Sequence, residues 1–266
     1  MTRLFSLIFI ALAAMMPSFG YAGSSKAGKP ILPAAEVAAF SNRVQRDLAS
    51  RGVHVAIVAR MGRDPKVLPP GIKYTHVSFW VFSQITRTDG STGRGYHAYN
   101  LYQDAGNKTR SNLIQDSPAD FFADAHILDA GIIIPDLRLQ KMLLNVIASP
   151  TYSTLHNAQY SVLANPNTSQ LQNCTEHTLD VLMASLYGTR NVPQIKANIA
   201  AHFQPQEIQV GGMKRLLAPS ASRALTTSDH GTKVETATFG SIARFMLKND
   251  LTSQVYRITP DMVIRF

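Results

Sequence analysis

Cysteine is almost absent from this chain of 266 residues, which contains only Cys174. A single cysteine cannot form an internal disulfide, and it cannot supply a paired-cysteine zinc motif. The sequence also lacks an HExxH motif and a glycine-rich phosphate loop set between a strand and a helix. These absences leave no recognisable pattern for a metal or a nucleotide, and we expect no cofactor.

Acidic residues are fewer than basic ones, 17 against 26, which gives a formal charge of +9. The lysines and arginines are scattered, and no basic stripe alternates with aromatic residues, so nucleic acid is not an expected partner. A mildly basic chain suits anionic polymers or lipid headgroups better. We expect a cell-envelope substrate, a peptide or a lipid, and the sequence gives no indication of oligomeric state.

Long apolar runs are confined to the beginning of the chain. Arg3 precedes the apolar residues 4–16, Pro17 breaks the run, and small residues lead up to Ala22. This pattern predicts a secretory signal peptide at 1–22, with a retained anchor as the alternative. No later stretch approaches the roughly 20 apolar residues of a membrane span. We therefore expect a periplasmic or secreted protein with no transmembrane span after signal removal.

The remainder of the chain, residues 23–266, has the length and composition of one domain. Residues 23–32 are rich in glycine, serine and lysine and predict a flexible leader. The sequence contains no internal repeat, and its most linker-like stretch is the loop at 211–231. A single domain is the expected organisation.

Three β-branched, apolar stretches at 53–61, 74–85 and 95–103 predict strands, and a glycine-rich loop separates the last two. Their order predicts an antiparallel meander. Apolar residues at helical spacing predict helices that begin near Pro33 and cover 118–122, 137–147, 193–203 and 238–247. A brief β-like run at 132–134 and an extended end at 254–266 complete an α+β fold, an antiparallel sheet packed against helices.

Cys174 lies in the first turn of another predicted helix. Asn173 is a good N-cap, Glu176 stands where a capping-box acid belongs, and Gly188 ends the pattern. Unpaired backbone N–H groups and the helix dipole favour a thiolate there, which predicts a thiol pKa below its ordinary value. The alternative is that Cys174 is a small buried hydrophobic residue.

A nucleophilic cysteine needs a base, and eight histidines are available. His177 follows Cys174 on the same helix, where both side chains point back along the axis, so we interpret it as structural. His76 opens a strand directly after a loop, and a rigid strand can hold an imidazole against a separate helix. The alternative for His76 is a partly buried strand histidine with a single hydrogen bond.

Three segments carry a resemblance to known proteins: Tyr74-Thr75-His76-Val77, Tyr99-Asn100-Leu101-Tyr102-Gln103 and Leu171-Gln172-Asn173-Cys174-Thr175-Glu176-His177. A strand histidine followed far downstream by a helix-opening cysteine resembles the circularly permuted papain-like fold. NlpC-type peptidases have the reverse order, and lecithin retinol acyltransferase-like proteins are permuted relatives. Over nearly the whole mature chain, the sequence more closely resembles an uncharacterised exported bacterial family, one of the numbered domains of unknown function.

The resemblance implies that Cys174 faces His76 across a cleft and that a polar residue on the next strand orients the imidazole. Asn100 and His97 are the candidates, and an odd separation places them on opposite faces of the strand. We favour Asn100, because an amide oxygen can accept from the imidazole N–H. The backbone N–H of Cys174 is a natural oxyanion donor, with Gln172 or Gln170 as further candidates.

Together these features predict an exported cysteine hydrolase or acyltransferase that attacks an amide, ester or thioester carbonyl. Cys174 would be the nucleophile, His76 the base and then the acid, and Asn100 the orienting residue. The alternative is a non-catalytic periplasmic binding protein on the same scaffold, since fold does not determine function.

Overall fold

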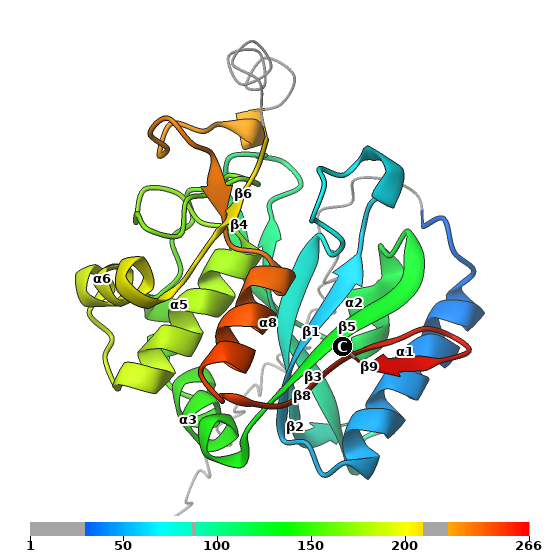
Figure 1. The fold of residues 1–266 in the computed structure, drawn as a ribbon. Coiled ribbons are helices and arrows are strands. Elements are labelled where there is room, and N and C mark those ends of the chain that lie inside the picture. The colour runs from blue at the N-terminus through cyan, green and yellow to red at the C-terminus, as the bar shows by residue number, and fades with distance from the viewer. Residues whose placement is uncertain (1–29, 87–88, 210–222, 266) are drawn as a thin grey trace, which may run out of the picture.

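The computed structural model describes residues 30–86, 89–209 and 223–265. The predicted signal peptide at 1–22 lies outside these ranges, as do most of the predicted leader at 23–32 and more than half of the predicted loop at 211–231. In the described part, a central sheet carries helices on both of its faces (Figure 1).

The central sheet has seven strands in the order β4-β3-β2-β1-β5-β8-β9, and every neighbouring pair is antiparallel. The α+β class and the antiparallel sheet packed against helices are confirmed. The strands of this sheet are β1 (Val55–Met61), β2 (His76–Thr86), β3 (Thr92–Gln103), β4 (Ser111–Asp116), β5 (Ile127–Pro135), β8 (Thr252–Ile258) and β9 (Val263–Arg265). A separate ladder pairs β6 (Gln206–Glu207) with β7 (Glu235–Thr236).

Helices cover the two faces of the sheet unequally (Figure 1). Helices α1 (Ala34–Ser50) and α2 (Pro118–Ala123) pack on one face of the sheet. Helices α3 (Leu137–Ile147), α5 (Cys174–Tyr187) and α8 (Phe239–Lys248) pack on the other. The helices are α1 (Ala34–Ser50), α2 (Pro118–Ala123), α3 (Leu137–Ile147), α4 (Pro150–Thr154), α5 (Cys174–Tyr187), α6 (Val192–His202) and α8 (Phe239–Lys248), with short 3-10 turns η1 (Pro65–Val67) and η2 (Arg223–Leu225).

Strand β1 lies inside the sheet, and all seven of its residues are buried. Its side chains alternate between two apolar clusters, which we name by the helix that each contains. Val55, Ile57 and Ala59 enter the α5-side core, whereas Ala56 and Val58 enter the α1-side core. A strand buried on both faces reads as a continuous apolar run, which is how it appears in the sequence.

The meander predicted from the first three strands is confirmed, because β1 pairs with β2 and β2 pairs with β3, both antiparallel. The helix predicted at 137–147 coincides with α3. The sequence did not reveal β4, whose residues are mostly polar and which forms by pairing with β3 at the sheet edge. It also did not reveal the short α4, and β5 is longer than the run predicted at 132–134.

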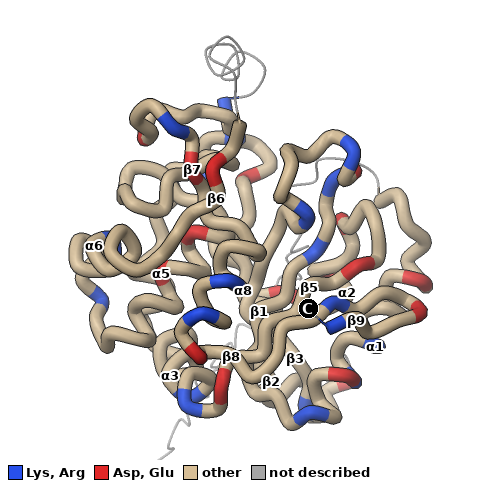
Figure 2. Tube along the Cα trace, in the orientation of Figure 1, with Lys and Arg blue, Asp and Glu red and all other residues tan. Residues whose placement is uncertain are grey.

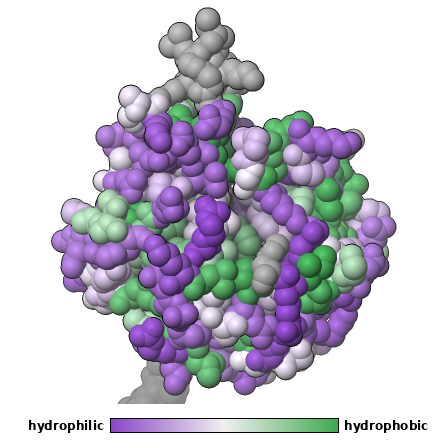
Figure 3. Space-filling view, in the orientation of Figure 1, coloured by the Kyte–Doolittle hydropathy of each residue, from purple (hydrophilic) through white to green (hydrophobic). Residues whose placement is uncertain are grey.

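In the described residues, no helix is both long and apolar enough to cross a membrane. Basic and acidic residues are interspersed around the molecule in the view of Figure 2. On the face seen in Figure 3, hydrophilic residues predominate and apolar residues occur between them.

Candidate active site

Cys174 is the first residue of α5, and the helix begins there because Asn173 caps it. Asn173 Oδ1 accepts a hydrogen bond from the backbone N–H of Glu176 at 2.9 Å. At the other end, Gly188 adopts the left-handed conformation with φ of 59°, as the sequence predicts. Glu176 does not complete a capping box, because its carboxylate turns to Lys196 instead. The N-terminal turn of α5 therefore keeps the thiol among backbone N–H groups.

The thiol of Cys174 is buried, with 7% of the residue exposed, and it packs against the backbone N–H of Val77 in β2. Burial is the largest influence and raises the pKa of the Cys174 thiol. The N–H groups of Val77 and Thr175, together with the Arg60 guanidinium, lower this pKa but do not reverse the shift. The prediction of a lowered thiol pKa is therefore wrong, since the sequence does not show how deeply a helix start is packed.

His76 is the first residue of β2, and Asn100 on β3 holds its ring. His76 Nε2 lies 3.1 Å from Asn100 Oδ1. The Asn100 amide nitrogen donates to the Ala98 carbonyl oxygen at 3.1 Å and to Asp116 Oδ2 at 3.3 Å. Because that nitrogen faces two acceptors, the amide oxygen must face the imidazole, and His76 Nε2 must carry the hydrogen.

This assignment leaves His76 Nδ1 as the unprotonated ring nitrogen. Among the residues that the structure describes, Nδ1 makes no hydrogen bond. Burial, and then the nearby Arg60, lowers the pKa of His76 to about 3, with Asn100 acting in the opposite direction. The imidazole is therefore neutral near pH 7 and presents a free lone pair at Nδ1.

Aromatic rings fix the plane of the imidazole. The Tyr102 ring stacks on it at 4.6 Å between centroids with an interplanar angle of 12°, and the Phe121 ring lies 5.6 Å away. These contacts come from β3 and α2, so the His76 side chain lies on the α1-side face of the sheet. A ring held on two sides and at Nε2 has little freedom to turn.

Arg60 lies opposite His76 in the register of β1 and β2. Its Nη1 donates to the Phe121 carbonyl oxygen at 2.6 Å, and its Nη2 lies 3.7 Å from Asp124 Oδ2. Its positive charge lowers the pKa of both Cys174 and His76, so it favours thiolate and disfavours imidazolium. Arg60 was not among the residues predicted from the sequence, although a charged residue inside the apolar run of β1 is a readable signal.

Of the three residues predicted for catalysis, the structure connects only two by a hydrogen bond. His76 and Asn100 are hydrogen-bonded, whereas no hydrogen bond connects Cys174 to His76 within the described ranges. Cys174 approaches from the helix on the α5 side and meets β2 at Val77, one residue beyond His76. The thiol and the imidazole thus flank the same end of β2 and share the electrostatic field of Arg60.

The two other histidines considered for the site have separate partners. His97 lies on the opposite face of β3 from Asn100, and its Nδ1 is 2.7 Å from Ser83 Oγ. His177 packs edge-on against the Tyr152 ring, and its Nε2 lies 3.2 Å from the Tyr152 carbonyl oxygen. Neither contacts the His76 imidazole, so Asn100 alone of the two candidates on β3 orients it.

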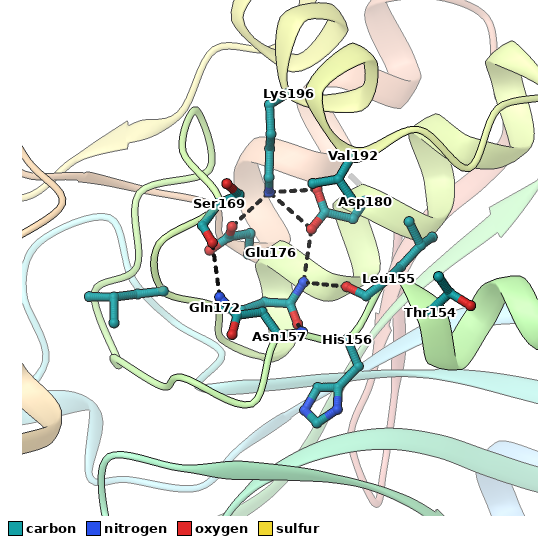
Figure 4. A pocket seen from close by; sticks show the side chains of 11 residues that line it. Thr154, Leu155, His156, Asn157, Ser169, Gln172, Glu176, Asp180, Val192 and Lys196 are labelled. Atoms are coloured by element: carbon teal, nitrogen blue, oxygen red, sulfur yellow. Dashed lines mark hydrogen bonds and ion pairs between the residues drawn. The ribbon is translucent and has the colours of Figure 1, made fainter.

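A buried ionic cluster that the sequence did not reveal lies deeper in the first two turns of α5 (Figure 4). Lys196 Nζ from α6 lies 2.7 Å from Glu176 Oε1 and contacts both carboxylate oxygens of Asp180, at 2.7 and 2.9 Å. These side chains line a cavity of about 100 Å³. The acids and the lysine lie at separate sequence positions, so only the packing of α6 on α5 brings them together.

Gln172 connects this cluster to the loop before Cys174. Its amide nitrogen donates to Asp180 Oδ2 at 2.9 Å and to the Leu155 carbonyl oxygen at 3.0 Å. Both amide hydrogens are therefore engaged, and Gln172 has none left for an oxyanion. Gln170 is exposed. The backbone N–H groups at the start of α5 remain the better donors.

Among the described residues, no group of three or more histidines, cysteines, aspartates or glutamates is arranged to hold a metal ion. The polar side chains at the site instead bind one another, through the hydrogen bonds from His76 to Asn100 and from Asn100 to Asp116. The arrangement offers a thiol, a neutral imidazole and backbone donors, which are the groups that acyl transfer through a thioester requires.

Comparison with known proteins gives one match. A family model described as an uncharacterised protein conserved in bacteria, DUF2145, matches residues 47–246. A search of curated proteins and a search of solved structures each found no match. The matched residues include Arg60, His76, Asn100 and Cys174.

Proposed function

Because this chain belongs to the DUF2145 family of uncharacterised conserved bacterial proteins, we propose its function from the site itself: a cysteine hydrolase or acyltransferase. The observation that carries the proposal is the His76 imidazole. Asn100 holds its Nε2, while Nδ1 keeps a free lone pair. A neutral imidazole that is held at one ring nitrogen can accept a proton at the other, which is what general-base catalysis requires.

In the proposed reaction, His76 Nδ1 takes the proton of the Cys174 thiol as the sulfur attacks a carbonyl carbon. Backbone N–H groups at the start of α5 hold the resulting oxyanion. The tetrahedral intermediate collapses to a thioester on Cys174, and the imidazolium gives its proton to the departing amine, alcohol or thiol. Water or a second acceptor then releases the acyl group, with His76 again acting as base.

The electrostatics favour a neutral resting pair over a preformed thiolate and imidazolium. Burial raises the pKa of the thiol and lowers that of His76 to about 3. Proton transfer then accompanies the attack on the carbonyl carbon, when the developing negative charge moves onto the oxyanion. Arg60 disfavours the imidazolium, which keeps the resting histidine neutral, and it favours negative charge at the sulfur as the thiol loses its proton.

The proposal extends to the fold, the location and the substrate. The helix-opening Cys174 packed on a strand that begins with His76 supports a circularly permuted papain-like arrangement. The apolar segment at 4–16 supports export to the periplasm or beyond, and the net charge of +9 supports an anionic cell-envelope substrate, a peptide or a lipid.

A second candidate function is a non-catalytic binding protein, and the burial of Cys174 favours it. A thiol with 7% of its residue exposed can be a small apolar core residue. On this alternative, the hydrogen bond between His76 and Asn100 would serve stability alone.

The pH dependence of alkylation separates the two functions. Cys174 is the only cysteine, so iodoacetamide reports on it alone. If His76 is the base, the rate stays level from about pH 4 to pH 8, because the imidazole is neutral throughout that range. His76→Ala should abolish this plateau, leaving a rate that rises about tenfold per pH unit as the thiol ionises.

Two matched variants complete the test. Asn100→Ala should lower the plateau without removing it, whereas His177→Gln should leave it unchanged, because His177 bonds to a backbone carbonyl away from the thiol. Incubation with short p-nitrophenyl esters should place an acyl group on Cys174, visible by intact mass and absent from Cys174→Ala. A wild-type profile identical to that of His76→Ala, with no acylation, would support the binding protein.

A further inference from the structure

Asp116 is the last residue of β4 and lies beside Ala98 in the register of β3 and β4. Ala98 and Asn100 are two residues apart on one strand, so their side chains share the face that carries His76. Asp116 is 3% exposed and Asn100 is fully buried. Asp116 Oδ2 accepts a hydrogen bond from the Asn100 amide nitrogen at 3.3 Å.

We infer that Asp116 is a positioning residue that sets the orientation of the Asn100 amide and, through it, the tautomer of His76. The contribution of Asp116 to catalysis rests on the function proposed above. Its effect on the histidine tautomer does not depend on that function.

The orientation follows from counting donors and acceptors. In the observed orientation, the Asn100 amide nitrogen faces the Ala98 carbonyl and the Asp116 carboxylate, which are both acceptors. A flipped amide would place its oxygen against both of them and its nitrogen against His76. Of these two acceptors, Ala98 contributes a backbone carbonyl and Asp116 contributes a side chain. Only the Asp116 acceptor can therefore be removed by a substitution.

The tautomer decides which ring nitrogen can act as a base. With the Asn100 oxygen facing Nε2, that nitrogen must carry the hydrogen, and Nδ1 is left to accept a proton. With a flipped amide, Nε2 would become the acceptor and Nδ1 would carry the hydrogen. A histidine in that tautomer cannot take the thiol proton at Nδ1.

Several groups surround Asp116. Burial raises the pKa of its carboxyl to about 6, with Tyr102 and Arg60 acting to lower it and Asp120 and Asp124 acting to raise it. The Tyr102 hydroxyl is close enough to affect this pKa, although its geometry and that of Asp116 Oδ1 fall short of a hydrogen bond. Near pH 7 the carboxylate is mostly ionised, which strengthens its hold on the Asn100 amide.

The test is the ¹⁵N chemical shifts of the His76 ring near pH 7, assigned by comparison with His76→Gln. The wild type should show a protonated Nε2 and an unprotonated Nδ1. Asp116→Ala removes one of the two acceptors that hold the Asn100 amide nitrogen and should populate the opposite tautomer beside the original one. Asp116→Asn should restore the wild-type shifts, because its amide oxygen can still accept from Asn100. Asp120→Ala is the matched control. Asp120 is a nearby carboxylate whose charge acts on Asp116, but it accepts a hydrogen bond from Ser117 and makes none with Asn100.

The alkylation plateau provides the second readout. It should fall about tenfold or more in Asp116→Ala, because a base in the wrong tautomer loses most of its effect, and recover in Asp116→Asn. If the alanine variant does not fold, Asp116→Leu fills the same space without an acceptor and takes its place.

The outcomes separate the two proposals. Wild-type ring shifts that persist in both Asp116→Ala and Asp116→Leu would overturn the positioning role. A tautomer that changes as expected, in a protein whose wild type has no plateau, would keep the positioning role and overturn the enzyme.

Discussion

Two buried polar groups, Lys196 on α6 and His76 on β2, adjoin the first turns of α5, and they differ in how many of their own hydrogen-bonding atoms are used. Lys196 has three ammonium hydrogens and three short contacts, one to Glu176 and two to Asp180. His76 is as deeply enclosed, yet it uses only Nε2 and leaves Nδ1 without a partner in the described residues. Lys196 has no hydrogen left to donate to a ligand, although Glu176 Oε2 in the same cluster has no hydrogen-bond partner among the described residues, whereas His76 keeps a lone pair available at Nδ1.

The charges at the two groups differ in the same way. At the lysine cluster, burial raises the pKa of Asp180 and Glu176, while Lys196 opposes that rise. Burial also lowers the pKa of Lys196, but the two acids more than offset it. At the candidate site, burial leaves a neutral thiol and a neutral imidazole. Internal charge pairing therefore marks the group that binds α6 to α5, and neutral groups mark the site proposed for catalysis.

The largest effect on stability should come from Lys196→Met. This change leaves Glu176 and Asp180 buried without their cation, and losing one partner of a buried ion cluster costs about 3–5 kcal/mol. Urea denaturation should show this loss in the unfolding free energy. The alkylation plateau of Cys174 should persist in the protein that remains folded.

The matched control is Lys233→Met. Lys233 pairs with Glu207 at 3.0 Å on the surface, where 64% of the Lys233 side chain and 41% of the Glu207 side chain are exposed. The unfolding free energy of the Lys233→Met variant should therefore stay near that of the wild type. The triple change Lys196→Met, Glu176→Gln and Asp180→Asn should recover most of the stability, since no charge then remains in this buried cluster. Equal losses from Lys196→Met and Lys233→Met would show that the buried cluster does not stabilise the fold.

An intermediate effect should appear on acidification, and here the two groups should behave alike. His76 at the site and His177 beside the lysine cluster both have a pKa of about 3 when folded, against about 6.5 when unfolded. Between these values the unfolded chain binds more protons, so the stabilisation is complete above pH 6.5 and is lost as the pH falls toward 3. At pH 5 each histidine should have cost about 2 kcal/mol relative to pH 7.5.

The measurement compares urea unfolding at pH 7.5 and pH 5 in wild type, His76→Gln and His177→Gln. Each variant should lose about 2 kcal/mol less than the wild type over this range. The comparison between variants matters because Asp116, with its pKa raised to about 6, acts in the opposite direction in all of them. A variant that keeps the full wild-type loss would show that the histidine it replaces binds protons equally in the folded and unfolded wild type, so that its pKa is not lowered by folding.

Much of the fold was predictable, because it follows from local patterns that the sequence displays. The meander β1–β2–β3 and the helix α3 follow from alternation and helical spacing. Strand β4 was missed because its polar residues carry no such pattern and it depends on a neighbour for pairing. Local propensity cannot reveal an element that its partner stabilises.

The candidate site was predictable in part for a similar reason. Counting along the strand placed Asn100 and His97 on opposite faces, and the acceptor oxygen of an amide favoured Asn100 before its hydrogen bond to His76 was known. Burial at Cys174, the field of Arg60 and the contact from Asp116 depend on tertiary packing. The sign of the thiol pKa was therefore wrong, since the backbone donors were visible in the sequence and the surrounding core was not.

Among the changes at the two buried groups, Cys174→Ala should have the smallest effect on stability, which sharpens the contrast with Lys196. The side chain is buried but small, and removing a comparable buried group costs about 0.5–1.5 kcal/mol. Urea denaturation should therefore show a protein close to wild type, while acylation by p-nitrophenyl esters disappears. Such an outcome would fit a residue whose contribution is chemical, because activity and stability often trade off at functional sites. A loss above about 3 kcal/mol would instead place Cys174 with Lys196, as a residue that the fold requires.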